Sequence, residues 1–333
     1  MVCGMIGDAL GAPVEGWPAA VIRKRHNTVQ TYLLGKPLGI SEARRGMYTD
    51  DTNCALALAA SVIRCQGRVD AQDCAEAQAS FWKQHKPERG YPWSSQKTMQ
   101  AILDGTPCTE TGTLNFPDGS YANGSAMKIG PIAVFSQNQP ASTVLHHVKE
   151  ALLSTHVHPE AIDGANVLTQ AIIHLLHTSP GTFDASAWLD HLLVVSETNA
   201  MKKRLSLLKK HCHSSMLPAI YVGLDDEKDG AHLETYGEMD FQIKAVVAVA
   251  CALWAFLMHP DDPLAAYGEA IGLGGDTDTI ATMLGYMIGA YHGCQWLPDH
   301  LWEGLESGEY GRDYCVNLSR QLTNLVPPAP TNM

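Results

Sequence analysis

Residues 271–281 read IGLGGDTDTIA, and they place two carboxylates, Asp276 and Asp278, directly before an apolar helical pattern. A second acidic stretch, YTDDT at residues 48–52, stands far upstream and also leads into an apolar helical pattern. Asp and Thr are favoured at helix N-termini, so capping explains either stretch taken alone. One cap needs one acceptor, however, and each stretch offers two carboxylates beside a helix that should be buried, where unpaired anions are costly.

Helical periodicity dominates the rest of the chain, and strand signals are few. Apolar side chains after each acidic stretch recur three and four residues apart, which predicts two core helices. Gly285, Gly289 and Gly293 stand four apart on one face, where they would let a neighbouring backbone approach closely. Residues 29–34 are the best strand candidate, and 106–125 read as a long loop. Further helices are expected over 71–85, 95–103, 141–154, 160–176, 185–197, 201–212 and 241–258, so one all-α domain over residues 1–333 is predicted.

Composition narrows the class of protein. A hydrophobic fraction of 45% with 17% charged residues describes a chain with a sizeable core, and the net charge of −12 argues against nucleic-acid or anionic-membrane partners. Nine cysteines without a Cys-x-x-Cys pair suit a reducing compartment rather than a disulfide framework. The longest apolar run is too short for a membrane span, and a cytoplasmic monomer is expected.

The two acidic stretches predict a metal centre if they meet in the fold. Four converging carboxylates would repel one another and raise their pKa values unless a cation intervened. Oxygen ligands without cysteine or histidine select a hard ion such as Mg²⁺. Four carboxylates can neutralise two divalent ions, so we expect a binuclear magnesium centre.

Six segments in order resemble the ADP-ribosylglycohydrolase family. They are GDALGAPVE (7–15), YTDDT (48–52), ERGY (88–91), GSYANGSAMKIGPI (119–132), THVHPEAIDGA (155–165) and GGDTDTIA (274–281). The resemblance implies a compact all-α fold around two Mg²⁺ ions, and it is greatest to the branch that removes ADP-ribose from serine and degrades its polymer. The arginine-directed branch and the nitrogenase-reactivating glycohydrolases are the near alternatives. Lys128 stands where the family commonly has Arg, and Pro92 where the serine-directed branch usually has Gly, which leaves the substrate preference open.

The resemblance also implies roles for individual residues. Glu15 matches the catalytic glutamate, which would pass a proton between water and the leaving group. Asp8 is interpreted as a helix cap, with support of the metal ligands as the alternative. The metal ligands implied are Thr49, Asp50, Asp51, Asp276, Asp278 and Thr279, and the substrate-binding residues are Gly90, Tyr91, Gly119, Ser120, Tyr121, Asn123, Gly124, His156 and Gly275.

Histidines and Tyr121 carry two interpretations each. His156 and His158 lack the helical spacing of a zinc pair, so a core role is favoured over a metal site, with ligand contact by His156 as the remaining option. Tyr121 either stacks on adenine or packs.

Three functions compete. The leading one is a Mg²⁺-dependent hydrolase acting on ADP-ribosylated protein or another ADP-ribosyl conjugate, such as O-acetyl-ADP-ribose or the polymer. A two-metal phosphohydrolase that cleaves a nucleotide diphosphate would use the same carboxylates. A non-catalytic ADP-ribose reader or lens-type structural protein would be expected to have lost metal ligands, and all six ligand positions are present.

Overall fold

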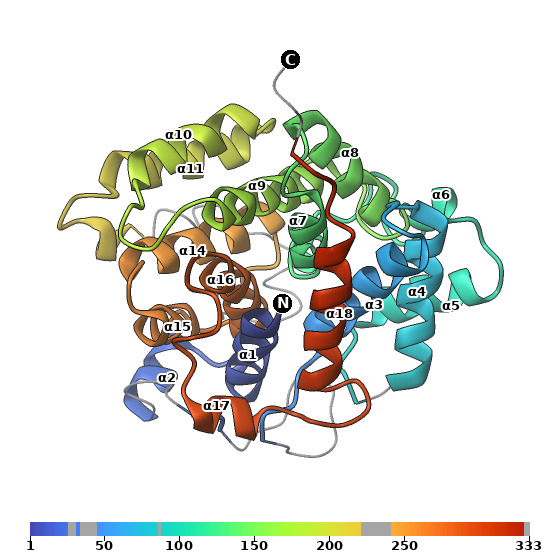
Figure 1. Cartoon of the computed structure of the whole chain (residues 1–333), viewed down its shortest axis with the longest axis horizontal. Coiled ribbons are helices and arrows are strands. Elements are labelled where there is room, and N and C mark those ends of the chain that lie inside the picture. The colour runs from blue at the N-terminus through green and yellow to red at the C-terminus, as the bar shows by residue number, and fades with distance from the viewer. Residues whose placement is uncertain (26–30, 34–44, 86–87, 221–240, 330–333) are drawn as a thin grey trace.

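Helices build the whole architecture. The computed structural model describes residues 1–25, 31–33, 45–85, 88–220 and 241–329. These residues form sixteen α-helices and no β-strand (Figure 1). Two isolated bridges, between Pro18 and Gly274 and between Ala122 and Lys244, are the β-type pairings among them. The all-α prediction is confirmed.

The α-helices are α1 Val2–Gly11, α2 Ala19–Arg25, α3 Asp50–Arg64, α4 Ala71–His85, α5 Trp93–Leu103, α6 Cys108–Thr111, α7 Gly130–Ser136, α8 Ala141–Leu152, α9 Pro159–Leu176, α10 Ala185–Val195, α11 Asn199–His211, α14 Ala245–Met258, α15 Pro263–Gly272, α16 Thr277–His292, α17 Asp299–Gly304 and α18 Arg312–Asn324. Short 3-10 turns η1 Ala12–Val14, η2 Asn123–Ser125 and η3 Leu217–Ala219 join some of them.

Differences from the predicted elements have local causes. The helix expected from residue 241 begins at Ala245, because the backbone before it pairs with the loop at residues 121–123. Ala245 donates its N–H to Tyr121 O at 3.0 Å, and Asn123 donates to Ile243 O at 2.7 Å. The loop predicted over 106–125 contains α6 and η2. The strand candidate at 29–34 lies mostly outside the described residues, and residues 31–33 form no strand.

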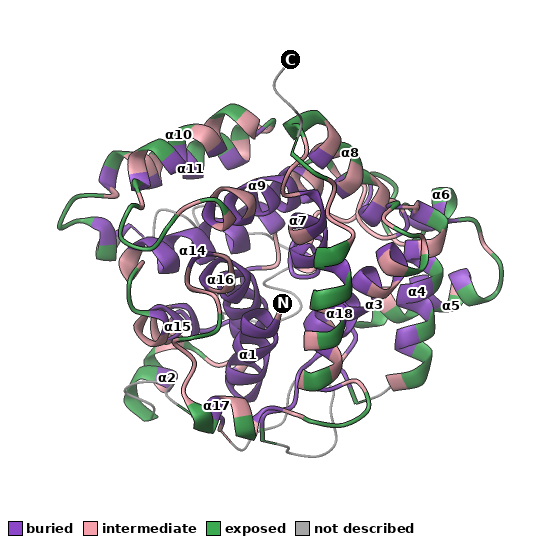
Figure 2. Cartoon of the chain, in the orientation of Figure 1, coloured by how far each residue is buried: buried purple, intermediate pink, exposed green. Residues whose placement is uncertain are grey.

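The core lies where α1, α9, α14 and α16 pack together, the purple centre of Figure 2. α14 is buried on every side from Ala245 to Leu257, which is why its sequence is apolar all round rather than on one face. Burial of this much apolar surface is the main favourable term in folding. The outer helices differ: α18 buries Cys315, Leu318 and Leu322 and turns polar side chains to solvent.

α1 and α16 approach so closely that only glycine fits at three contact points. A Cβ atom on Gly7 would lie 2.1 Å from the Ala281 carbonyl oxygen, one on Gly11 2.5 Å from Asp278 Cα, and one on Gly285 2.2 Å from Cys3 O. The close packing predicted for Gly285 is therefore present. Gly293 differs, because it ends α16 with a φ of 67°. The consequence is that the start of α16 lies against α1.

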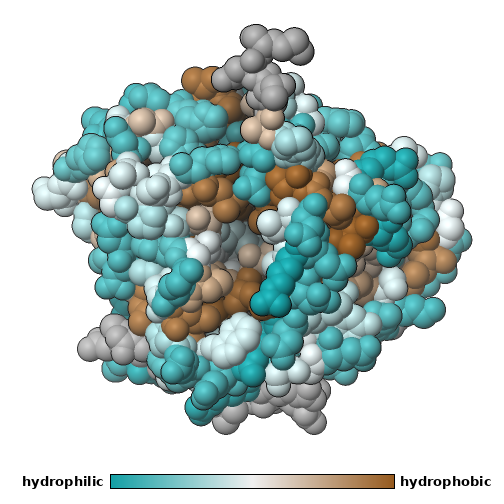
Figure 3. All heavy atoms as spheres, in the orientation of Figure 1, coloured by the Kyte–Doolittle hydropathy of each residue, from teal (hydrophilic) through white to brown (hydrophobic). Residues whose placement is uncertain are grey.

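The surface seen in Figure 3 is largely hydrophilic around α18 and α10, with apolar patches between the outer helices. No helix within the described ranges is long and apolar enough to cross a bilayer.

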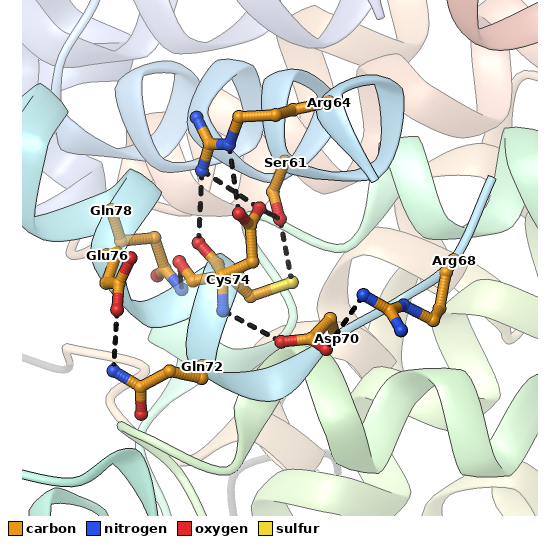
Figure 4. A network of polar contacts seen from close by, with 9 residues as sticks. Ser61, Arg64, Arg68, Asp70, Gln72, Cys74, Glu76 and Gln78 are labelled. Atoms are coloured by element: carbon orange, nitrogen blue, oxygen red, sulfur yellow. Dashed lines mark hydrogen bonds and ion pairs between the residues drawn. The ribbon is translucent and has the colours of Figure 1, made fainter. Parts of the chain in front are cut away.

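A polar network joins α3 to α4 in Figure 4: the Arg64 guanidinium donates to Asp73 at 2.9 Å, and the Ser61 hydroxyl donates to the same carboxylate.

Candidate active site

The two acidic helix starts meet beside α1. Carboxylate oxygens of Asp8, Asp51 and Asp278 lie within 4.8 Å of one another, and so do those of Glu15, Asp276 and Asp278. Asp278 belongs to both groups. These carboxylates come from α1, the residue that follows η1, the first turn of α3 and the start of α16, which lie far apart in the sequence.

Asp8 lies inside α1 and caps another helix, α3. Its carboxylate accepts from Thr49 N at 2.9 Å and Thr52 N at 3.0 Å, and from the Thr52 hydroxyl at 2.6 Å. The capping interpretation of Asp8 thus describes a cap across helices rather than within one. Because the same carboxylate belongs to the first acidic group, Asp8 also shapes the candidate cation site. In the sequence, Asp8 is a single acidic residue within GDALG, and nothing there predicts that its carboxylate caps a different helix.

Thr49 and Asp51 lie at the N-terminal end of α3. Thr49 is the N-cap, and its Oγ1 lies 2.9 Å from Asp8 Oδ1 and 2.9 Å from Asp51 Oδ2. The other oxygen, Asp51 Oδ1, is buried and has no hydrogen-bond partner among the described residues. Buried polar atoms nearly always have a partner, so an anionic oxygen left alone here fits direct contact with a cation.

A turn with two consecutive glycines holds Glu15 next to the start of α16. Gly274 and Gly275 have φ values of 71° and 72°. Gly16 donates its N–H to Gly275 O at 2.8 Å, and Gly275 donates to Trp17 O at 3.0 Å. Glu15 is thereby held, partly exposed, beside Asp276 and Asp278.

Asp276 is hydrogen-bonded to the loop to which the family resemblance gives a substrate-binding role. Asn123 Nδ2 donates to Asp276 Oδ2 at 2.5 Å and to Gln242 O at 2.8 Å. Asp276 in turn donates its backbone N–H to Gln242 Oε1 at 3.0 Å. Gln242 was not foreseen, since nothing in its sequence neighbourhood marks it. In α16, Thr279 N donates to Asp278 Oδ1 at 2.9 Å.

A cavity of about 620 Å³ opens onto these carboxylates. That volume suits a ligand of drug-like or nucleotide size. Gly119 and Gly275 do not line it: Gly119 adopts a φ of 82°, and a Cβ there would lie 2.7 Å from His158 N, so both glycines shape backbone turns. The expected residues that do line it are Glu15, Thr49, Asp50, Asp51, Gly90, Tyr91, Ser120, Tyr121, Asn123, Gly124, His156, Asp276, Asp278 and Thr279.

Aromatic side chains on the cavity wall were missed by sequence reasoning. Trp93 and Phe116 line the cavity, yet they are 73% and 48% exposed. Exposed aromatic rings at a cavity suit stacking on a planar group. Tyr121 also lines the cavity, and its ring meets His158 edge-on at 5.9 Å between centroids, so it both packs and faces the site.

Lys128 and His156 form another part of the cavity wall. Lys128 is 2% exposed, and its Nζ donates to Gln78 Oε1 and Thr155 Oγ1, each at 2.9 Å. Burial, and next the Lys128 charge, hold the pKa of His156 well below its usual range, so its ring is neutral. His158 caps α9 by accepting from Glu160 N at 3.1 Å. Histidine belongs to neither of the metal-type groups found in the described part of the chain, and His156 lines the cavity, so contact between His156 and a ligand stays open beside the core interpretation.

Burial raises the pKa values of the carboxyl groups at this site. Burial raises the pKa of Asp50 to about 8, with repulsion from Asp8 and Asp276 adding to it. Burial also raises the pKa of Asp8 to about 6, although hydrogen bonds from Thr52 and Thr49 oppose the rise. The pKa of Asp278 is raised well above its usual range by burial and then by the nearby charge of Glu15.

Stabilisation by Mg²⁺ is expected to increase as the pH rises from about 6 to about 8. The cation-free native state keeps protons that the unfolded chain has released above pH about 4, so its free energy of unfolding falls as pH rises through the raised pKa values. A divalent cation at these carboxylates would have to displace those protons, so it would bind better when they are gone. Melting temperatures with EDTA and with saturating Mg²⁺ should therefore diverge across this range. A gap that stays constant would contradict the coupling.

The chain is similar to known proteins in both sequence and fold. A family model described as ADP-ribosylglycohydrolase matches residues 1–330. Human ADP-ribosylhydrolase ARH3 is 29% identical over 329 residues, which cover 92% of this chain and 87% of that protein. The putative ADP-ribosyl glycohydrolase L543 of Acanthamoeba polyphaga mimivirus is 27% identical, with 86% and 84% covered. A solved structure described as an ADP-ribosylglycohydrolase-related protein complex matches with a TM-score of 0.67 at 22% identity, covering 98% of this chain and 95% of that one, which supports the fold.

Proposed function

This chain belongs to the ADP-ribosylglycohydrolase family, and we propose that it uses two Mg²⁺ ions to cleave ADP-ribose from protein serine. Membership makes it an enzyme that hydrolyses a glycosidic bond of ADP-ribosylated substrates. The bond proposed for cleavage is the one at the anomeric carbon, in serine-linked ADP-ribose first and also in its polymer or O-acetyl-ADP-ribose. One observation carries the proposal. Two clusters of carboxylates share Asp278, and they lie on the wall of a cavity large enough for a nucleotide.

The residues present fit a pair of hard cations. The family is metal-dependent, and both candidate groups offer carboxylate oxygens alone. The unpartnered Asp51 Oδ1 and the raised pKa values both indicate that positive charge is needed there. The proposed ligands are Thr49, Asp50, Asp51, Asp276, Asp278 and Thr279, with Asp8 orienting Thr49. When bound, Mg²⁺ would supply Lewis acidity and a more acidic water.

Chain residues would perform the remaining chemistry. Cleavage at the anomeric carbon builds positive charge on the sugar, and the leaving oxygen needs a proton. Glu15 holds the position for moving that proton, since the Gly16–Gly275 hydrogen bond places it beside Asp276 and Asp278. We assign the loop at residues 119–124 to the diphosphate and adenosine, the exposed rings of Trp93 and Phe116 to stacking, and His156, with Gly90 and Tyr91, to the ribose side.

A substrate panel tests the activity. Metal-stripped protein that receives Mg²⁺ should release free ADP-ribose from a serine-linked peptide faster than from an arginine-linked one. Faster release from arginine would establish the alternative linkage, which Pro92 and Lys128 leave open. AMP plus ribose phosphate as products would identify the phosphohydrolase, and ADP-ribose binding without any turnover would identify a reader.

We further propose a monomeric single domain over residues 1–333 that acts in the cytoplasm without nucleic-acid or membrane partners. The family model supports the single domain, because it spans residues 1–330. Light scattering should give the mass of one chain, 36.1 kDa, and fractionation of expressing cells should leave the protein in the cytosol. A dimer mass or a membrane-bound fraction would contradict these points.

A further inference from the structure

Arg89 holds the peptide unit that precedes the candidate metal ligands. It is 5% exposed, and its Nη1 donates to Tyr48 O at 2.8 Å. Its guanidinium carbon also lies 3.4 Å from the centroid of the Tyr48 ring. Both terminal nitrogens donate to the Glu306 carboxylate, at 2.8 Å and 2.7 Å, which makes a bidentate pair.

The Tyr48–Thr49 peptide plane is therefore fixed at both ends. Its carbonyl oxygen accepts from Arg89, and its N–H donates to Asp8 Oδ1 at 2.9 Å. Because the peptide unit is planar, a rotation that frees the carbonyl would also move the N–H away from Asp8. Thr49 Oγ1 contacts the same Asp8 oxygen at 2.9 Å and also lies 2.9 Å from the carboxylate of Asp51, so loss of the N–H contact would disturb the contacts that hold Asp51.

The segment between α17 and α18 completes this support (Figure 1). Glu306 donates its N–H to Gly46 O at 3.0 Å, and the Tyr48 hydroxyl donates to Tyr310 O at 3.0 Å. Arg312 N donates to Glu306 O at 2.8 Å, which holds the segment in shape. Residues near the C-terminus thus contact the chain just before the cation site at more than one point.

We propose that Arg89 and Glu306 are positioning residues of the cation site. Their ion pair fixes the orientation of the Tyr48–Thr49 peptide, and through its contacts the positions of the Thr49 and Asp51 side chains. This rests on the proposed function only in taking residues 49–51 as cation ligands. The ion pair is partly buried, with the Glu306 side chain 27% exposed. Desolvation offsets much of the attraction in such a pair, whereas its bidentate contact defines geometry well. Residues that orient metal ligands typically contribute 10- to 100-fold in affinity.

Arg89 also lines the cavity, so contact with an anionic part of the substrate is the competing role. The present contacts favour positioning, because both terminal nitrogens of Arg89 already donate to Glu306 and Tyr48. The two roles differ in what they change. Positioning sets cation affinity, whereas substrate contact sets KM.

The test measures Mn²⁺ affinity by electron paramagnetic resonance in the full chain. Glu306→Gln and Arg89→Lys should each weaken Mn²⁺ binding about tenfold. Lysine keeps the charge of Arg89 but cannot hold Tyr48 O and both Glu306 oxygens together. Asp73→Asn is the matched control, since it breaks the Arg64–Asp73 pair between α3 and α4 and should leave the Mn²⁺ affinity unchanged (Figure 4). At saturating Mg²⁺, kcat and KM of both test variants should return to wild-type values.

Each other outcome overturns the inference in a distinguishable way. Wild-type Mn²⁺ affinity in Glu306→Gln and Arg89→Lys removes the positioning role, even if their melting temperatures fall. A raised KM with unchanged Mn²⁺ affinity assigns Arg89 to the substrate instead. Wild-type protein that binds no Mn²⁺ refutes the cation site of the proposed function as well.

Discussion

Asp278→Asn is expected to abolish binding of divalent cations and to lower kcat/KM about a thousandfold or more. Asp278 belongs to both clusters of carboxylates, so its replacement would remove one candidate ligand from each. A catalytic cation of this kind would lower the activation barrier by several kcal/mol, and about 4 kcal/mol corresponds to a thousandfold in rate. Titration with Mn²⁺ and steady-state kinetics on an ADP-ribosylated peptide would measure the two effects.

The same substitution should not destabilise the cation-free protein. Burial, and next the charge of Glu15, raise the pKa of Asp278, so at neutral pH folding must either keep this side chain protonated or bury its charge. A neutral amide avoids that cost. The melting temperature in EDTA should equal or exceed that of the wild type, and added Mg²⁺ should no longer raise it.

Asp163→Asn provides a matched control with the opposite pattern. Asp163 is equally buried but accepts from Glu197 N at 2.9 Å and Thr198 N at 2.7 Å, away from the cavity. Its replacement should lower the melting temperature and leave cation affinity intact. If Asp278→Asn bound Mn²⁺ as tightly as the wild type, the carboxylates would not form a cation site.

Glu15→Gln is expected to lower kcat by 10²- to 10⁴-fold while cation affinity changes little. Glutamine keeps the size of the side chain but cannot exchange the proton that the leaving oxygen needs. The pH profile of the remaining kcat should also lack the limb that arises from ionisation of this carboxyl group. Single-turnover kinetics with saturating Mg²⁺ across a pH series would measure both.

The alternative for Glu15 is direct cation binding, because its carboxylate is grouped with Asp276 and Asp278. In that case Glu15→Gln would weaken Mn²⁺ binding, and high Mg²⁺ would restore kcat. Glu150→Gln, on a partly exposed glutamate of α8, is the control and should change neither quantity. Wild-type kcat in Glu15→Gln would remove the residue from the mechanism.

Helices were predictable because their signal is local. The apolar spacing after YTDDT and GGDTDT repeats within one turn of helix, so α3 and α16 follow from the sequence without knowledge of their neighbours. The start of α14 was missed by four residues, since Ile243 and Lys244 pair with a distant loop and no local pattern reports that pairing.

The carboxylates were predictable as residues but not as a site. Charge beside an apolar helix is visible in the sequence, and the resemblance to the family supplied the roles of Asp51 and Asp278. Their distance apart depends on Gly7 and Gly11, which let α1 bring Asp8 against the starts of α3 and α16.

By itself, therefore, the sequence determined an all-α chain, its two acidic helix starts and its family, because periodicity and motif order are written along one dimension. The tertiary structure alone decided that Asp8 caps α3, that Gln242 holds Asp276, and that Arg89 meets Glu306. Hydrogen bonds and ion pairs act over about 3 Å in space whatever the distance along the chain. Contacts of that kind exist only once the helices have packed.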